Sequence, residues 1–97
     1  MPKAYIVFSY HSITDPQKFA VYAKLAPAAV APFGSRVLAR GTAAAAYEQG
    51  MKERILIAEF PSLEKAIAAY NSPAYKEALK ALGDGAARDV RIVEGLE

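Results

Sequence analysis

The sequence predicts an α+β protein in which four strands and two helical segments alternate in the order βαββαβ. Two observations support this order. Short runs rich in β-branched and aromatic residues recur along the chain, and the segments between them carry apolar residues at the three-to-four spacing of amphipathic helices. A chain of 97 residues and 10.4 kDa is long enough for one modest hydrophobic core. We therefore expect residues 1–97 to form a single domain.

The first strand is predicted over residues 3–10, where aromatic and branched side chains dominate. Both faces of this run are largely apolar, which is typical of a strand that is covered on both sides. Asp15 can accept a hydrogen bond from a free helix N–H, and Pro16 suits the first helical position. The apolar stripe that follows, over residues 19–30, predicts an amphipathic helix that ends at Phe33-Gly34.

Two further strands are predicted over residues 36–40 and 54–60. The first of the two could run on as far as Tyr47, which would give a hairpin with its turn near Gln49-Gly50. Both strands contain the alternating or branched pattern that favours a sheet. The hairpin places them next to each other.

The second helical segment is predicted to be split in two. Ser62 caps one short apolar stripe, and Ser72, followed by Pro73, caps another twelve residues later. A closing strand follows over residues 90–94. This order predicts a ferredoxin-like fold, with a four-stranded antiparallel sheet in the order 4-1-3-2 and the helices on one face. Because the other face is also apolar, we expect a second copy of the chain to cover it in a homodimer.

Composition argues against several classes of function. The formal net charge is +2 and the basic residues are scattered, whereas a nucleic-acid-binding protein needs a concentrated basic face. The chain has no cysteine and one histidine, so we expect no metal site and no thiol chemistry, and no glycine-rich motif indicates a cofactor. No segment has the length of a membrane span or the form of a signal peptide, so a cytoplasmic protein without a membrane or nucleic-acid partner is expected.

Four short phrases carry a family resemblance over essentially the whole chain. They are Ala39-Arg40-Gly41, Ile57-Ala58-Glu59-Phe60-Pro61-Ser62, Tyr70-Asn71-Ser72-Pro73-Ala74-Tyr75 and Ile92-Val93-Glu94-Gly95. In order and spacing they resemble the uncharacterised bacterial family known as domain of unknown function 1330, of the dimeric α+β barrel group. The relatives of that group include small cofactor-independent monooxygenases and muconolactone isomerase-like enzymes. The resemblance implies the fold and a homodimer, and it does not supply a reaction. Our leading hypothesis is that the dimer binds or transforms a small organic molecule without a cofactor.

This chain departs from the family pattern in two places. The family often has Arg-Gly-Gly where this chain has Arg40-Gly41-Thr42, and often a basic residue where it has Leu82-Gly83. If that basic residue binds an anion in relatives, this chain binds something else or nothing.

Three residues are candidates for catalysis. Arg40 ends a strand beside a glycine, and its guanidinium could hold a carboxylate; its structural alternative is a salt bridge on the edge strand. Glu59 could be a partly buried general base, or could accept hydrogen bonds from the N–H groups near Ser62. His11, the single imidazole, could move a proton and could pair with Glu59, because both are expected at one end of the sheet; a solvated loop histidine is the alternative.

Ligand binding is expected from Arg40 together with Tyr70, Tyr75 and Glu94. The tyrosines supply hydroxyl groups, although their helical stripes also suit core or interface packing. Glu94 is expected at the same end of the sheet as Arg40 but three strands away, so an ion pair between them would need a partner chain. These residues leave two functions open. One is cofactor-independent binding or chemistry, with the candidates converging on one cavity; the other is a non-enzymatic dimeric binding or stress-related module.

Overall fold

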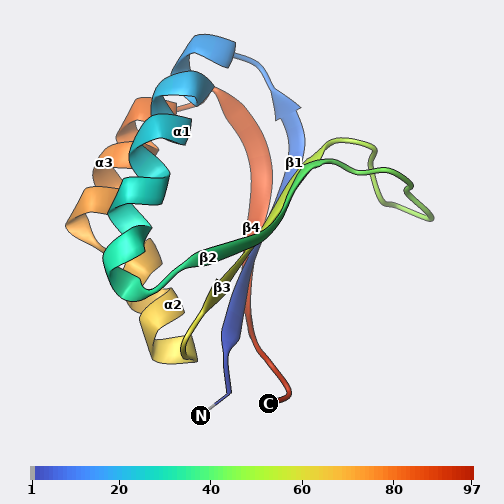
Figure 1. Cartoon of the computed structure of the whole chain (residues 1–97). Helices are drawn as coiled ribbons and strands as arrows, with labels where there is room; N and C mark the ends of the chain where they lie inside the picture. The colour runs from blue at the N-terminus through green and yellow to red at the C-terminus, as the bar shows by residue number, and fades with distance from the viewer. Residues whose placement is uncertain (1) are drawn as a thin grey trace.

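The four predicted strands form one antiparallel sheet in a computed structural model that describes residues 2–97 (Figure 1). They are β1 (Ala4–Ile13), β2 (Arg36–Thr42), β3 (Arg54–Phe60) and β4 (Ala86–Glu94), in the order β2-β3-β1-β4. This is the predicted 4-1-3-2 order read from the opposite edge, with the two most apolar strands in the centre. The predicted α+β, ferredoxin-like fold is confirmed. Both outer strands are longer than predicted, and β4 begins four residues earlier, at Ala86 rather than Val90.

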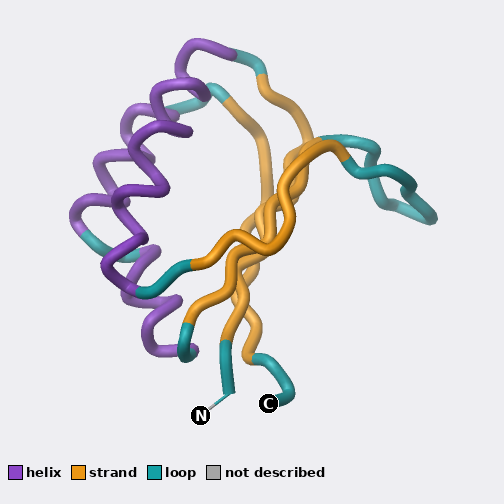
Figure 2. The backbone as a smooth tube through the Cα atoms, in the orientation of Figure 1, coloured by secondary structure: helices purple, strands orange, loops and turns teal. Residues whose placement is uncertain are grey.

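Three helices lie together on one face of the sheet (Figures 1 and 2). They are α1 (Pro16–Val30), α2 (Leu63–Tyr70) and α3 (Pro73–Leu82). Ser62 accepts a hydrogen bond from the N–H of Lys65, and Ser72 from the N–H of Tyr75, so both predicted caps are present. A short 3₁₀ turn over residues 31–33 (η1) extends α1, and Gly34 ends it in the left-handed conformation at φ 82°.

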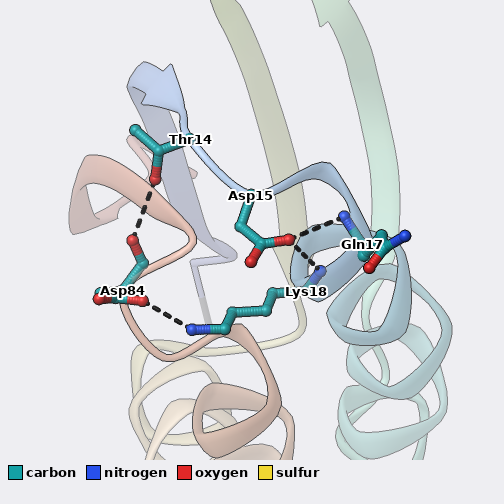
Figure 3. Close-up of polar contacts among 5 residues, drawn as sticks. All are labelled: Thr14, Asp15, Gln17, Lys18 and Asp84. Atoms are coloured by element: carbon teal, nitrogen blue, oxygen red, sulfur yellow. Dashed lines mark hydrogen bonds and ion pairs between the residues drawn. The ribbon is translucent and has the colours of Figure 1, made fainter.

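A side-chain cap and contacts with the connection that follows α3 fix the start of α1 (Figure 3). The Asp15 carboxylate accepts hydrogen bonds from the N–H groups of Gln17 and Lys18, each at 3.1 Å. The Lys18 ammonium reaches the Asp84 carboxylate at 2.8 Å, and the Thr14 hydroxyl donates to the Asp84 carbonyl at 3.1 Å. These contacts join the β1–α1 connection to the α3–β4 connection, which holds α1 beside α3.

The β2–β3 connection is a long loop and not a continuation of the strands. β2 ends at Thr42, so the alternative in which it runs on to Tyr47 is wrong. A turn does lie near Gln49-Gly50, where the N–H of Gly50 donates to the carbonyl of Tyr47 at 2.9 Å, but the strand does not reach it. Figure 1 shows this loop projecting away from the sheet and the helices.

The two faces of the sheet have different surroundings. Even-numbered residues of β1, from Ala4 to Tyr10, point toward the helices and are buried. Odd-numbered residues of the central strands point the other way, where no element of residues 2–97 covers them (Figure 2). This outer face, as we call it, carries the partly exposed side chains of Tyr5, Val7, Ile55, Ile57 and Val93. None of the helices in residues 2–97 is long and apolar enough to span a membrane.

Candidate functional site

A cavity of about 180 Å³ lies between α1 and the inner face of the sheet. We call it the helix–sheet pocket. α1 packs closely along α3 but makes few contacts with the strands, so it stands away from the sheet above this space. Most of the lining is apolar: Ile6, Phe8, Phe19, Ala26, Val30, Val37, Leu56, Ala58 and Phe60 contribute to it. The pocket can therefore accept an apolar molecule or part of one.

A cluster of three tyrosines and one arginine lies beside the pocket. One terminal nitrogen of Arg88 (Nη1) donates to the hydroxyls of Tyr10 at 2.8 Å and Tyr22 at 3.0 Å, and the other (Nη2) donates to Tyr75 at 3.4 Å. The hydroxyls of Tyr22 and Tyr75 are also hydrogen-bonded to each other. All three tyrosines line the pocket and are almost fully buried, with exposed fractions of 6 %, 6 % and 1 %. We call this group the Tyr–Arg88 cluster.

Aromatic rings supply much of the environment of the Arg88 charge. Its guanidinium carbon lies 4.8 Å from the ring centre of Tyr22 and 5.1 Å from that of Phe8. Burial raises the pKa of Tyr75 well above its usual value, and burial also raises the pKa of Tyr10. Both phenols are therefore protonated at neutral pH. They can donate a hydrogen bond to a bound molecule, but they cannot serve as bases.

Two arginines, Arg40 and Arg54, line the pocket on its β2–β3 side. Arg40 lies opposite Leu56, and Arg54 lies opposite Thr42, so the two are diagonal neighbours on the inner face. The guanidinium of Arg54 lies over the Phe19 ring at 5.2 Å. Its Nε is buried and has no hydrogen-bond partner in the described part of the chain, a loss that typically costs about 1–3 kcal/mol.

The arginines around the pocket have no acidic partner. Of the ion pairs formed within residues 2–97, none includes Arg40, Arg54 or Arg88. The structural alternative for Arg40, a salt bridge on the edge strand, is therefore absent from this part of the chain. Among the described residues, the pocket lining contains no aspartate, glutamate, histidine or lysine. The site combines an apolar interior with uncompensated positive charge.

Glu59 does not reach the pocket. It pairs with Tyr5 of β1 and Arg36 of β2 on the outer face, and its carboxylate lies 3.4 Å from the Lys3 ammonium. This ion pair is neither of the two roles expected for Glu59. The side chain faces away from the helices because odd-numbered residues of β3 point outward.

The expected pair of His11 and Glu59 is wrong. β1 and β3 are antiparallel and Ala4 lies opposite Phe60, so Glu59 lies at the start of β1, whereas His11 lies near its end. The exposed His11 ring instead contacts the Asp89 carboxylate at 3.2 Å and the Met51 sulfur at 3.4 Å. His11 contributes to an open groove on the β4 side of the cluster, outside the pocket.

The expected placement of Arg40 and Glu94 at one end of the sheet is also wrong. Glu94 lies opposite Ala4, whereas Arg40 is level with Leu56 and Phe8, four residues further along β1. Glu94 is exposed and is not among the residues that line the pocket. The structure thus brings Arg40, Tyr70 and Tyr75 to one cavity and places Glu59, His11 and Glu94 elsewhere.

Sequence reasoning missed Arg88 and Arg54, although the signal was present. Arg88 alternates with Ala86 and Val90 on one face of β4, but the strand was predicted to begin after it. Arg54 alternates with Leu56 on the inner face of β3. An arginine at an inward position of an apolar strand indicates either a buried ion pair or a ligand site. Among residues 2–97, no group of His, Asp and Glu side chains is arranged to hold a metal ion.

Comparisons with known proteins agree with this fold. The family model described as "Domain of unknown function (DUF1330)" matches residues 3–96, which confirms the resemblance predicted from the sequence. A protein of unknown function from Rhodopseudomonas palustris, RPA0582, is 17 % identical, with a TM-score of 0.72 over 96 % of this chain and 80 % of that one. No curated protein matches this chain.

Two further solved structures have informative descriptions. SnoaB from Streptomyces nogalater, described as a cofactor-independent oxygenase, has a TM-score of 0.65 and 14 % identity over 100 % of this chain and 96 % of that one. A protein from Thermobifida fusca, described as a dimeric ferredoxin-like protein of unknown function, has a TM-score of 0.62 and 16 % identity over 97 % of this chain and 91 % of that one. At these identities the likeness shows the fold and not the activity.

Proposed function

The chain belongs to the DUF1330 family, which is defined without an activity. We therefore propose a function from the chain's own pocket: the protein binds a small, largely apolar organic molecule. The observation that carries this proposal is the helix–sheet pocket, in which apolar walls enclose a space with polar groups concentrated at the Tyr–Arg88 cluster and the β2–β3 side. Ligand pockets typically combine an apolar lining with a few placed polar groups. A cavity of about 150 Å³ can hold benzene, so about 180 Å³ suits a molecule with one ring.

We propose that any chemistry in this pocket proceeds without a cofactor. The description of SnoaB as a cofactor-independent oxygenase supports this version of the function. The hydrogen-bond donors of the Tyr–Arg88 cluster could stabilise negative charge on a bound molecule, which is a common catalytic contribution. The absence of Glu59 and His11 from the described pocket lining favours the alternative, a dimeric binding module without turnover.

A variant that fills the pocket tests the binding function. Ala26 lies on the pocket side of α1, and Ala28 lies on its exposed side. Ala26→Leu is expected to occupy the cavity and remove the rise in melting temperature that a binding molecule from a panel of small aromatic compounds produces. Ala28→Leu adds the same volume to the same helix and is expected to keep that rise. If Ala26→Leu retains full binding, the pocket is not the binding site.

We also propose that two copies associate through the outer face. The chain exposes 6316 Å², whereas a compact monomer of this mass exposes roughly 5,400 Å². The excess of about 900 Å² is close to the roughly 800 Å² that each partner buries in a standard protein interface. Tyr5, Val7, Ile57 and Val93 supply the apolar surface that such an interface needs. The Thermobifida fusca neighbour, which is described as dimeric, supports association of two copies.

A charge placed on the outer face tests this association. Ile57→Lys puts an ammonium opposite Val7 in the middle of the apolar surface, and it is expected to convert a dimer of about twice 10.4 kDa into a monomer. Ile67→Lys is the matched control, because Ile67 is an exposed isoleucine on α2 in the helical layer. Light scattering measures both masses. A monomeric wild-type protein would contradict the proposal directly.

A further inference from the structure

We propose that the ligand of the helix–sheet pocket is already an anion when it binds: a small organic carboxylate with an apolar body of about one ring, held by Arg54 and the tyrosine hydroxyls. This inference rests on the proposed function and specifies its substrate class. Three independent features of the described residues carry it: hydrogen atoms without an acceptor, positive charge without a partner, and the absence of a base from the pocket.

The first feature is a count of hydrogen-bond donors. Arginine can only donate, so the hydroxyl oxygens of Tyr10, Tyr22 and Tyr75 all accept from Arg88. Each phenol still has one hydrogen to donate, and the bond between Tyr22 and Tyr75 uses one of the three. The hydrogen of Tyr10 and one hydrogen of the Tyr22–Tyr75 pair have no acceptor within residues 2–97. A ligand oxygen would accept them.

The second feature is a row of charge across the inner face. On one side of β1, Arg88 of β4 lies opposite Tyr10. On the other side, Ile55 of β3 lies opposite Ser9, so the next residue pair along the two strands is Arg54 and Tyr10. Two guanidinium groups thus flank one buried phenol, and no carboxylate of the described chain neutralises either. Arg40, diagonal to Arg54, adds a third positive charge to the site. An anionic ligand would supply the missing negative charge.

The third feature concerns how the negative charge arises. The described lining of the pocket contains no carboxylate, imidazole or amine that could remove a proton from a neutral ligand. A site with strong positive charge and no base selects molecules that are already ionised in solution. Carboxylates meet this condition at neutral pH, and their two oxygens match the planar fork of a guanidinium.

Benzoate and benzamide are suitable probes because they have nearly the same size and shape and differ in charge. Titration calorimetry of the wild-type chain is expected to show benzoate binding at least about tenfold more tightly than benzamide. Arg54→Gln removes one charge from the edge of the pocket and is expected to abolish this preference while benzamide binding stays unchanged. Tyr10→Phe removes one free hydroxyl hydrogen and is expected to weaken benzoate more than benzamide.

Lys65→Gln is the matched control. Lys65 is exposed on α2 in the helical layer, lies outside the pocket lining and carries the same charge, so this variant is expected to keep the wild-type preference. Equal binding of the two probes, or tighter binding of benzamide, overturns the inference and leaves the proposed pocket in place. Failure of both probes to bind counts against the inference and the proposed function together. An equal loss of preference in Lys65→Gln would show a general charge effect and would also overturn it.

Discussion

Replacing Arg88 by methionine is expected to lower the free energy of unfolding by about 2–4 kcal/mol. The change removes three hydrogen bonds that a charged donor makes to buried hydroxyls, each with a typical value of about 1.5–3 kcal/mol. It also removes the contacts between the guanidinium and the aromatic rings of Phe8 and Tyr22. Methionine carries no charge, so the variant also avoids the free-energy cost of burying a guanidinium without an acidic partner. This gain offsets part of the lost stability.

Urea denaturation followed by circular dichroism measures the effect of Arg88→Met. Lys65→Met is the control, because Lys65 is an exposed cation on α2 in the helical layer, so its loss is expected to change stability by no more than about 0.5 kcal/mol. Equal stability of Arg88→Met and the wild type would mean that the desolvation of the guanidinium cancels its hydrogen bonds. In that case the cluster would not stabilise the fold.

Stability is expected to fall steeply as the pH rises above about 10, the ordinary tyrosine pKa. Burial raises the pKa of Tyr75 and that of Tyr10, so both phenols stay protonated in the folded chain at a pH where the unfolded chain has lost those protons. The unfolded state then binds fewer protons, and the free energy of unfolding decreases with pH. Each such group contributes about 1.4 kcal/mol per pH unit, until the pH passes its pKa in the folded protein.

Unfolding midpoints in urea between pH 8 and about pH 12, a range that brackets the ordinary tyrosine pKa, test this expectation. Tyr75→Phe removes one of the two groups and is expected to reduce the slope by about 1.4 kcal/mol per pH unit. Tyr47→Phe is the control, since Tyr47 is 79 % exposed in the β2–β3 loop and is expected to leave the slope unchanged. A slope in Tyr75→Phe that equals the wild-type slope would contradict the burial of a protonated Tyr75.

The order of the elements could be predicted from the sequence because it depends on local patterns. The apolar run of β3 was predicted with the bounds that the structure shows, and the caps at Asp15, Ser62 and Ser72 were each identified from side chains that satisfy nearby N–H groups. The strand order followed from the βαββαβ order of the ferredoxin-like fold, and the apolar character of the two central strands agrees with it. Of the four residues expected to bind a ligand, Arg40, Tyr70 and Tyr75 line one cavity and Glu94 does not.

The register of the strands and the content of the pocket were decided by the tertiary structure. Antiparallel pairing places Glu59 beside Tyr5 on the outer face, and the alternation of side chains fixes that face once the register is set. His11 and Glu59 each lie near the end of a strand, and adjacent antiparallel strands end at opposite ends of a sheet, so the expected His11–Glu59 pair was already inconsistent with the predicted antiparallel order.

The Tyr–Arg88 cluster shows the same division. Tyr10, Tyr22, Tyr75 and Arg88 come from four different elements, separated by as many as 78 positions in the chain. By itself the sequence placed the three tyrosines on apolar faces, where burial is favourable, whereas Arg88 lay outside the predicted last strand. Only packing of the helices on the sheet determined that their polar ends meet, because hydrogen bonds among distant side chains form after the apolar faces have been brought together.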